Sequence, residues 1–109
     1  FFGTTKDKII CDEIENILKS DFVVNRAGKT SILGLSTVFS QLNFLICNDS
    51  GAMHLANSVG THVFAVFANT NPEVTGPVFD SAKNIIQVSM INGNRCVSEV
   101  ILSELKQFL

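Results

Sequence analysis

Two short apolar runs constrain the fold of this chain more than any other feature. Residues 44–47 are an apolar run that predicts a buried strand, and residues 63–67 contain no polar alternation, which predicts a strand buried on both faces. Between them, residues 52–59 have a short helical pattern, and Gly60 follows it where a left-handed C-terminal cap is expected. A strand, a helix and a second buried strand predict a parallel pair joined by a crossover helix.

The same alternation extends along the rest of the chain. Helices are expected at residues 7–19 and 98–109. A further helix is expected to begin at Ser31, a candidate N-cap, and to end at about Gln41. Short strands are expected at residues 22–25 and 85–88. A loop is predicted at residues 69–80, which contain both prolines, and a turn at 92–94. We therefore predict an α/β fold, a Rossmann-like parallel sheet with helices on both faces, as one domain over residues 1–109.

The first residues predict that part of the domain lies upstream. Phe1 and Phe2, followed by Gly3, have the pattern of a strand's end and its turn, and two residues are too few to pair well. We expect a fragment that lacks its first strand and an upstream domain, rather than a complete small domain.

Composition excludes several classes of partner. A 46% hydrophobic content and 17% charge allow a packed core. The net charge of -2, without a run of lysine or arginine, argues against nucleic acid. No apolar segment approaches the roughly 20 residues of a transmembrane helix. The three cysteines, Cys11, Cys47 and Cys96, form no C-x-x-C pair. A metal site, a disulfide framework and a cofactor are thus not expected, and a reducing cytoplasm is the expected compartment.

The predicted strand 44–47 leads into a polar corner. Asp49, Ser50, Gly51 and His54 lie where the strand turns into the helix, the edge of an open α/β sheet that faces the ligand crevice. Backbone N–H groups at a helix start favour a phosphate, and Gly51 permits close approach. Asp49 could accept hydrogen bonds from sugar hydroxyls, or it could simply cap the helix. The sequence favours neither interpretation over the other. His54 could bind a phosphate oxygen or be an ordinary surface residue, and His62 is interpreted as structural.

Two further loops would lie at the same edge of the sheet. The loop with Lys29, Thr30 and Ser31 opens a helix but lacks the glycine spacing of a P-loop. In the turn after Gly3, Asp7 could bind a ribose, as acidic residues do in dinucleotide folds, or could be a first-turn helix acid.

Together these segments resemble glycosyltransferase family 9, the ADP-heptose:lipopolysaccharide heptosyltransferases. The resemblance is carried by residues 25–32 (NRAGKTSI), residues 48–56 (NDSGAMHLA), and Thr70-Asn71-Pro72 followed by Thr75-Gly76-Pro77. Their order and spacing match, and the resemblance covers nearly the whole chain. It implies that this chain is the C-terminal, nucleotide-sugar-binding half of a GT-B glycosyltransferase.

The resemblance also implies roles for individual residues. Asp49, Ser50, Gly51 and His54 would contact the donor's diphosphate and heptose. Lys29, Thr30 and Ser31 would lie near the adenine, and Asp7 stands where the family often has a ribose-binding glutamate. Family members invert the anomeric carbon without a structural metal for donor binding, and their catalytic base lies in the N-terminal domain. No catalytic residue is therefore expected in this chain.

The chain departs from the family pattern at two places. Ala68-Asn69 replaces a usual Gly-Pro before Thr70, which would affect the loop beside the acceptor, and Ala52 replaces a frequent proline. The expected function is donor binding in an inverting transfer of heptose from an ADP-sugar to lipopolysaccharide core or a lipid A-linked acceptor. An epimerase-like nucleotide-sugar enzyme of GT-B fold and a non-catalytic Rossmann-like interaction module remain as alternatives. Peripheral association with the inner membrane would suit a lipid-linked acceptor, but no basic amphipathic helix in the sequence supports it.

Overall fold

The computed structural model describes residues 1–79, 83–91, 93 and 95–109. They form two compact units, Phe1–Leu35 and Ser36–Leu109. Of the predicted turn at residues 92–94, only Gly93 is described, with φ +74°, and its neighbours lie outside the described residues. The last residue of the predicted loop 69–80 also lies outside them.

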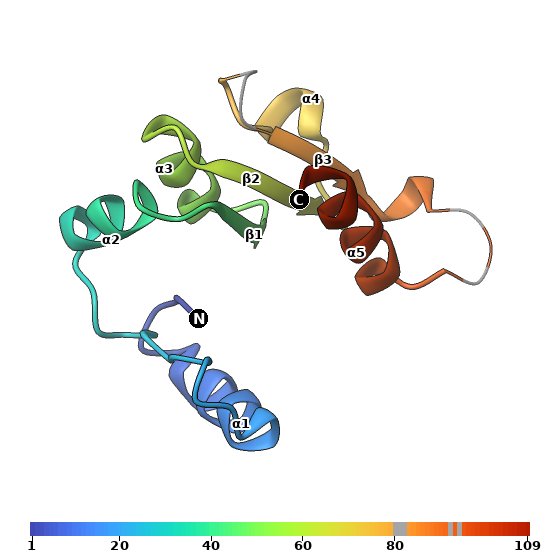
Figure 1. Cartoon of the computed structure of the whole chain (residues 1–109). Helices are drawn as coiled ribbons and strands as arrows, with labels where there is room; N and C mark the ends of the chain where they lie inside the picture. Colours follow the sequence, from blue (N-terminus) through green and yellow to red (C-terminus); the bar gives the residue numbers. More distant parts are fainter. Residues whose placement is uncertain (80–82, 92, 94) are drawn as a thin grey trace. The chain divides into compact units, whose positions relative to one another are not determined.

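The second unit contains a parallel sheet of three strands. The strands are β1 (Phe44–Asn48), β2 (His62–Phe67) and β3 (Lys83–Gln87), in the order β1-β2-β3 (Figure 1). Ile46 is in register with Phe64, and Phe64 with Asn84. This arrangement confirms the α/β class and the parallel pairing predicted from the apolar runs.

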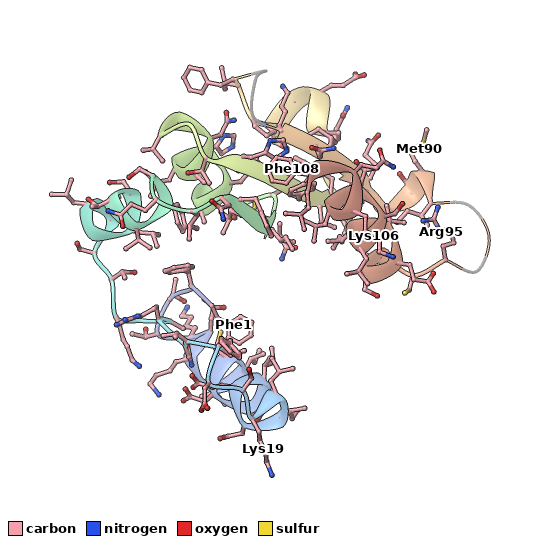
Figure 2. The ribbon with its side chains drawn as sticks, in the orientation of Figure 1. Phe1, Lys19, Met90, Arg95, Lys106 and Phe108 are labelled. Carbon is pink, nitrogen blue, oxygen red and sulfur yellow. The ribbon has the colours of Figure 1, made fainter. Side chains whose placement is uncertain are left out.

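Helices cover both faces of this sheet. In-register residues share a face, and side chains alternate along each strand. On one face Cys47, Ala65 and Phe67 pack with Met53 of α3 (Gly51–Ser58). On the opposite face, the Phe108 ring of α5 (Val97–Phe108) meets the rings of Phe44, His62 and Phe64 in edge-on or tilted contacts (Figure 2). The predicted placement of helices on both faces is therefore confirmed.

The two predicted central strands differ in burial. Val63, Phe64, Ala65 and Phe67 are fully or almost fully buried, as predicted for β2. β1 is only partly buried, and Ile46 is 43% exposed, which corrects the prediction of a buried strand at residues 44–47. The reason is that β1 pairs with one neighbour in the described sheet, whereas β2 pairs with two.

Helix α2 (Ile32–Phe39) begins where the sequence predicts. Ser31 caps it, because the Ser31 hydroxyl accepts a hydrogen bond of 3.1 Å from the Gly34 N–H. Only Phe39 of this helix is buried, and Thr61 donates to the Phe39 carbonyl over 2.6 Å. The sequence thus predicts the start of this helix correctly, and the residues before Phe39 are partly buried or exposed.

The first unit is organised around α1 (Lys8–Leu18) and the buried amide of Asn25. Asn25 donates from its side chain to Asp12 over 2.6 Å and from its backbone to Glu15 over 3.1 Å. Its Oδ1 accepts from the Ala27 N–H over 2.9 Å. One residue therefore ties the helix to the segment that follows it.

The strands predicted at residues 1–2 and 22–25 are absent from the described structure. Phe22 is 98% exposed in a turn, and the Asn25 N–H is used by Glu15 instead of a neighbouring strand. Two backbone bonds of parallel type do occur, from Phe1 to the Val24 carbonyl and from Arg26 to the Phe1 carbonyl. Two bonds do not make a strand pair, so neither predicted strand forms in this part of the chain.

Two short helices complete the described elements. Helix α4 (Pro72–Thr75) interrupts the predicted loop, and the 3-10 helix η2 (Val88–Met90) follows β3 directly. Among the described residues, no helix is both long and apolar enough to span a membrane.

Candidate functional site

The polar corner lies at the carboxyl end of β1, as the sequence predicts. β1 ends at Asn48 and α3 begins at Gly51, with Ser50 in extended backbone conformation as the N-cap residue. The Ser50 hydroxyl does not cap the helix and instead donates to the Asn48 carbonyl over 3.2 Å. The first turn of α3 therefore has no side-chain acceptor at its start.

The first backbone amides of α3 are available to a ligand. The N–H groups of Met53 and His54 both point to the Ser50 carbonyl, at 3.1 and 3.5 Å. Those of Gly51 and Ala52 have no acceptor within the described part of the chain. Free N–H groups and the positive end of the helix dipole make this a site that favours an anion.

Asp49 does not cap α3, which excludes one of the two interpretations of its sequence position. Its Oδ2 accepts a hydrogen bond of 2.7 Å from the Thr75 hydroxyl. Hydrogen bonds from Thr70 and Thr75, in that order of effect, lower the pKa of Asp49, and the charge of His54 adds to them. The carboxylate is thus ionised at neutral pH and attached to the loop that follows β2.

His54 is exposed on α3, and Ser58 one turn later is also exposed. The opposite side of the helix buries Met53, Ala56 and Asn57. His54 therefore lies on the exposed side of the helix, where either of its two interpretations from the sequence would place it. Asp49 precedes the first turn of α3 and His54 lies in it, and the charge of His54 contributes to the lowering of the Asp49 pKa.

The loop that reaches Asp49 is shaped by α4. Asn71 caps this helix, since its Oδ1 accepts from the Glu73 N–H over 2.9 Å, and Pro72 occupies the first helical position. The Thr75 hydroxyl also lies 3.2 Å from the Asn71 carbonyl. Sequence reasoning missed Thr70 and Thr75 as site residues, although Asn71-Pro72 was a readable signal for a helix start.

The other candidate residues lie in the first unit. Asp7 directly precedes α1, but its Oδ2 accepts from both the N–H and the hydroxyl of Thr4, each over 2.7 Å. These bonds lower the pKa of Asp7. The carboxylate therefore closes its own turn and makes no side-chain cap of the helix.

The two loops of the first unit adjoin each other. The Gly28 N–H donates to the Gly3 carbonyl over 2.9 Å, and a Cβ at Gly28 would press on Thr5. After Gly28, which has a φ of +71°, Lys29 donates from Nζ to the Asn25 carbonyl over 3.1 Å. The structure thus brings the turn of Asp7 beside the loop of Lys29, Thr30 and Ser31, with Ser31 used as the α2 cap.

Within the described residues, no group of three or more histidine, cysteine, aspartate or glutamate side chains is arranged to hold a metal ion. His62 has a structural environment: its Nε2 lies 2.6 Å from Asn84 Oδ1, and the Asn84 amide donates to Glu104 over 2.7 Å.

Comparison with known proteins agrees with the resemblance noted in the sequence. Residues 1–103 match the family model of glycosyltransferase family 9 (heptosyltransferase). Lipooligosaccharide heptosyltransferase 2 of Haemophilus influenzae is 34% identical over 84 residues, which cover 74% of this chain and 24% of that protein. Lipopolysaccharide heptosyltransferase 2 of Salmonella typhimurium is 29% identical and is covered over 25% of its length, against 77% of this chain.

A solved structure confirms the fold. The crystal structure of the glycosyl transferase family 9 from Veillonella parvula superposes with a TM-score of 0.71 at 22% identity, over 94% of this chain and 29% of that one. The chain thus spans about a quarter of the length of the curated relatives named above. From the match of its residues 1–103, the chain belongs to glycosyltransferase family 9, the heptosyltransferases.

Proposed function

We propose that this chain is the donor-binding part of a glycosyltransferase that moves heptose from an ADP-sugar to lipopolysaccharide core. Family membership supports the class of reaction. The observation that carries the donor role is the corner at the end of β1, where two free amides, an exposed histidine and an ionised carboxylate meet. An ADP-sugar offers the matching groups, which are a diphosphate and a hydroxylated ring.

The charges at the corner indicate which residue would bind which part of the donor. The Asp49 carboxylate repels a diphosphate, so it would accept a hydrogen bond from a heptose hydroxyl. The N–H groups of Gly51 and Ala52 would donate to diphosphate oxygens, together with the side chains of Ser50 and His54. In this assignment the carboxylate recognises the sugar and the helix start recognises the leaving group.

The nucleotide would be held by the adjoining loops of the first unit. Lys29, Thr30 and Ser31 would lie near the adenine, and Asp7 would accept from a ribose hydroxyl. Support comes from the direct contact of these loops through Gly28 and Gly3. Because Oδ2 of Asp7 is already used by Thr4, only its remaining acceptor capacity is available to a ribose.

In the proposed inverting transfer, an acceptor hydroxyl attacks the anomeric carbon while the bond to the diphosphate oxygen breaks. The hydroxyl proton passes to a base outside this chain, and ADP leaves with the bonding electrons. The start of α3 would stabilise the negative charge on ADP, and one such donor is worth roughly 2.7–4 kcal/mol in other enzymes. The 109-residue chain alone would bind donor weakly and would transfer no sugar.

Calorimetric titration with ADP and with ADP-heptose tests the assignment. His54→Ala should weaken both ligands roughly tenfold, as expected for loss of a charge-assisted hydrogen bond. Asp49→Asn should weaken ADP-heptose but not ADP, because ADP lacks the sugar. Ser58→Ala, at an exposed position one turn along α3, serves as the matched control.

Three results would count against the proposal. If neither His54→Ala nor Asp49→Asn changes the affinity for ADP or ADP-heptose, the corner is not part of the donor site. Absence of any binding at millimolar ligand would favour a non-catalytic interaction module. Measured sugar transfer by the chain alone would contradict the assignment of the base to another part of the protein.

A further inference from the structure

Asn57 has a buried side chain that none of the candidate roles explains. It lies in α3 and is only 2% exposed. Both ends of its amide bond the same residue: Oδ1 accepts from the Phe79 N–H over 2.9 Å, and Nδ2 donates to the Phe79 carbonyl over 3.2 Å. A buried amide satisfied in this two-point manner fixes a backbone segment more strictly than an apolar contact would.

These two bonds hold the far end of the loop that serves the candidate site. The loop leaves β2 after Phe67, contains α4, and reaches Phe79. At its near end the Thr75 hydroxyl donates to Asp49 over 2.7 Å, and Asp49 lies two positions before Gly51, the first residue of α3. The segment that runs from Asp49 through α3 therefore holds the loop at two places, at Thr75 through Asp49 and at Phe79 through Asn57.

The segment between these two places has little freedom. Gly76 donates to the Pro72 carbonyl over 2.9 Å, and Pro77 is buried. The Pro77 carbonyl accepts from Lys83 Nζ over 2.9 Å. If Phe79 moved, the few residues between it and Thr75 would therefore move with it. The Thr75 hydroxyl would then leave hydrogen-bond distance of Asp49.

We propose that Asn57 is a positioning residue for the donor site, which acts by fixing the loop so that Thr75 reaches the Asp49 carboxylate. The role in donor binding rests on the proposed function, whereas the link from Asn57 to Asp49 is a property of the free chain. Asn57 itself touches no ligand in this account. It sets the orientation of the carboxylate that would receive the sugar hydroxyl.

The link is tested without ligand by NMR titration of the Asp49 side-chain carboxyl. Thr75→Val should shift the Asp49 pKa upward, because it removes one of the donors that lower it. Asn57→Ala should shift it in the same direction, and the double variant should shift it no further than the larger single change. Ile86→Ala, a core substitution in β3, is the control for general loss of stability and should leave the Asp49 pKa unchanged.

A second variant covers the case in which Asn57→Ala does not fold. Asn57→Asp keeps the acceptor for the Phe79 N–H but loses the donor to its carbonyl, so an upward shift is again expected. An Asp49 pKa equal to that of the wild-type chain in the folded Asn57 variants would overturn the proposal. A wild-type value in Thr75→Val, or an equal upward shift in Ile86→Ala, would also overturn it.

Donor titration of the same variants separates this proposal from the proposed function. Asn57→Ala and Thr75→Val should weaken ADP-heptose by a similar factor and leave ADP alone nearly unaffected. If the Asp49 shift appears but no variant changes ADP-heptose binding, the positioning link stands and the donor site is wrong. If binding falls in Thr75→Val but not in Asn57→Ala, the donor site stands and the positioning role is wrong.

Discussion

Gly51 is the residue at which ligand binding and folding can be separated most cleanly. It occupies the first position of α3, and a Cβ added there would meet nothing within 4 Å. Its backbone does not require a glycine, since its φ is not in the left-handed region. The fold therefore gives no reason for a glycine here, whereas close approach of a diphosphate does.

Gly51→Ala should accordingly leave the free energy of unfolding unchanged or slightly increased, and should weaken ADP binding. Urea unfolding and calorimetry on the same sample measure the two effects. Gly60→Ala provides the contrast, because Gly60 has a φ of +84° and should lose roughly 1–2 kcal/mol without a change in ADP affinity. Unchanged ADP binding in folded Gly51→Ala would contradict a close diphosphate.

The cysteines differ in their expected reactivity. Burial raises the pKa of the Cys47 thiol to about 11, so almost none of it is thiolate at neutral pH. Cys96 is exposed near the start of α5. Iodoacetamide at neutral pH should therefore modify Cys96 well before Cys47, as followed by peptide mass spectrometry. Faster modification of Cys47 would mean that β1 is less well packed than described.

Among the elements, α4 ends at a glycine that leaves no room for a side chain. A Cβ at Gly76 would overlap the carbonyl oxygen of Pro72, which is backbone and cannot move aside easily. Gly76→Ala should displace the last turn of α4 and with it Thr75. We expect a raised Asp49 pKa in NMR titration and weaker ADP-heptose binding. Retention of both wild-type values would show that α4 does not hold Thr75 in place.

The sequence predicts some elements better than others, for physical reasons. The βαβ unit of β1, α3 and β2 was predictable because its apolar runs and the following Gly60 agree with each other. The strand expected at residues 22–25 failed because β-propensity cannot reveal that the Asn25 N–H bonds to Glu15. The short helix α4 was overlooked because the prolines of its loop suggested only a turn.

The candidate site was predictable in position but not in its connections. Asp49, Gly51 and His54 were placed at the corner from spacing alone, and they lie there. That Asp49 bonds Thr75, 26 positions away, depends on the path of a loop that no local pattern specifies. The same holds for Asn57 and Phe79, which are 22 positions apart.

At the scale of the whole molecule, several carboxylates link stability to pH. The pKa values of Asp7, Asp12 and Asp49 are lowered below the ordinary value of 3.8, chiefly by hydrogen bonds from Thr4, Lys8 and Thr70, respectively. A group with a lowered folded pKa stabilises the fold fully above its unfolded value, and this contribution is lost as the pH falls through the folded value.

The free energy of unfolding should therefore be level near neutral pH and fall as the pH drops below about 4, near the ordinary value of these carboxyls. Urea unfolding across this range measures it. Asp49→Asn removes one contributor, so its acid-side decline should be shallower than that of the wild type. An equally steep decline in Asp49→Asn would mean that the Thr70 and Thr75 bonds do not stabilise the ionised carboxylate.

In the proposed function, the start of α3 holds the diphosphate of an ADP-sugar. Titration of the ¹⁵N-labelled chain with ADP, observed through its backbone amides, tests it most directly. The N–H signals of Gly51 and Ala52 should shift downfield in proportion to binding, while the signal of Gly93 should stay in place. Binding of ADP that moves other amides but leaves those of Gly51 and Ala52 unchanged would contradict it.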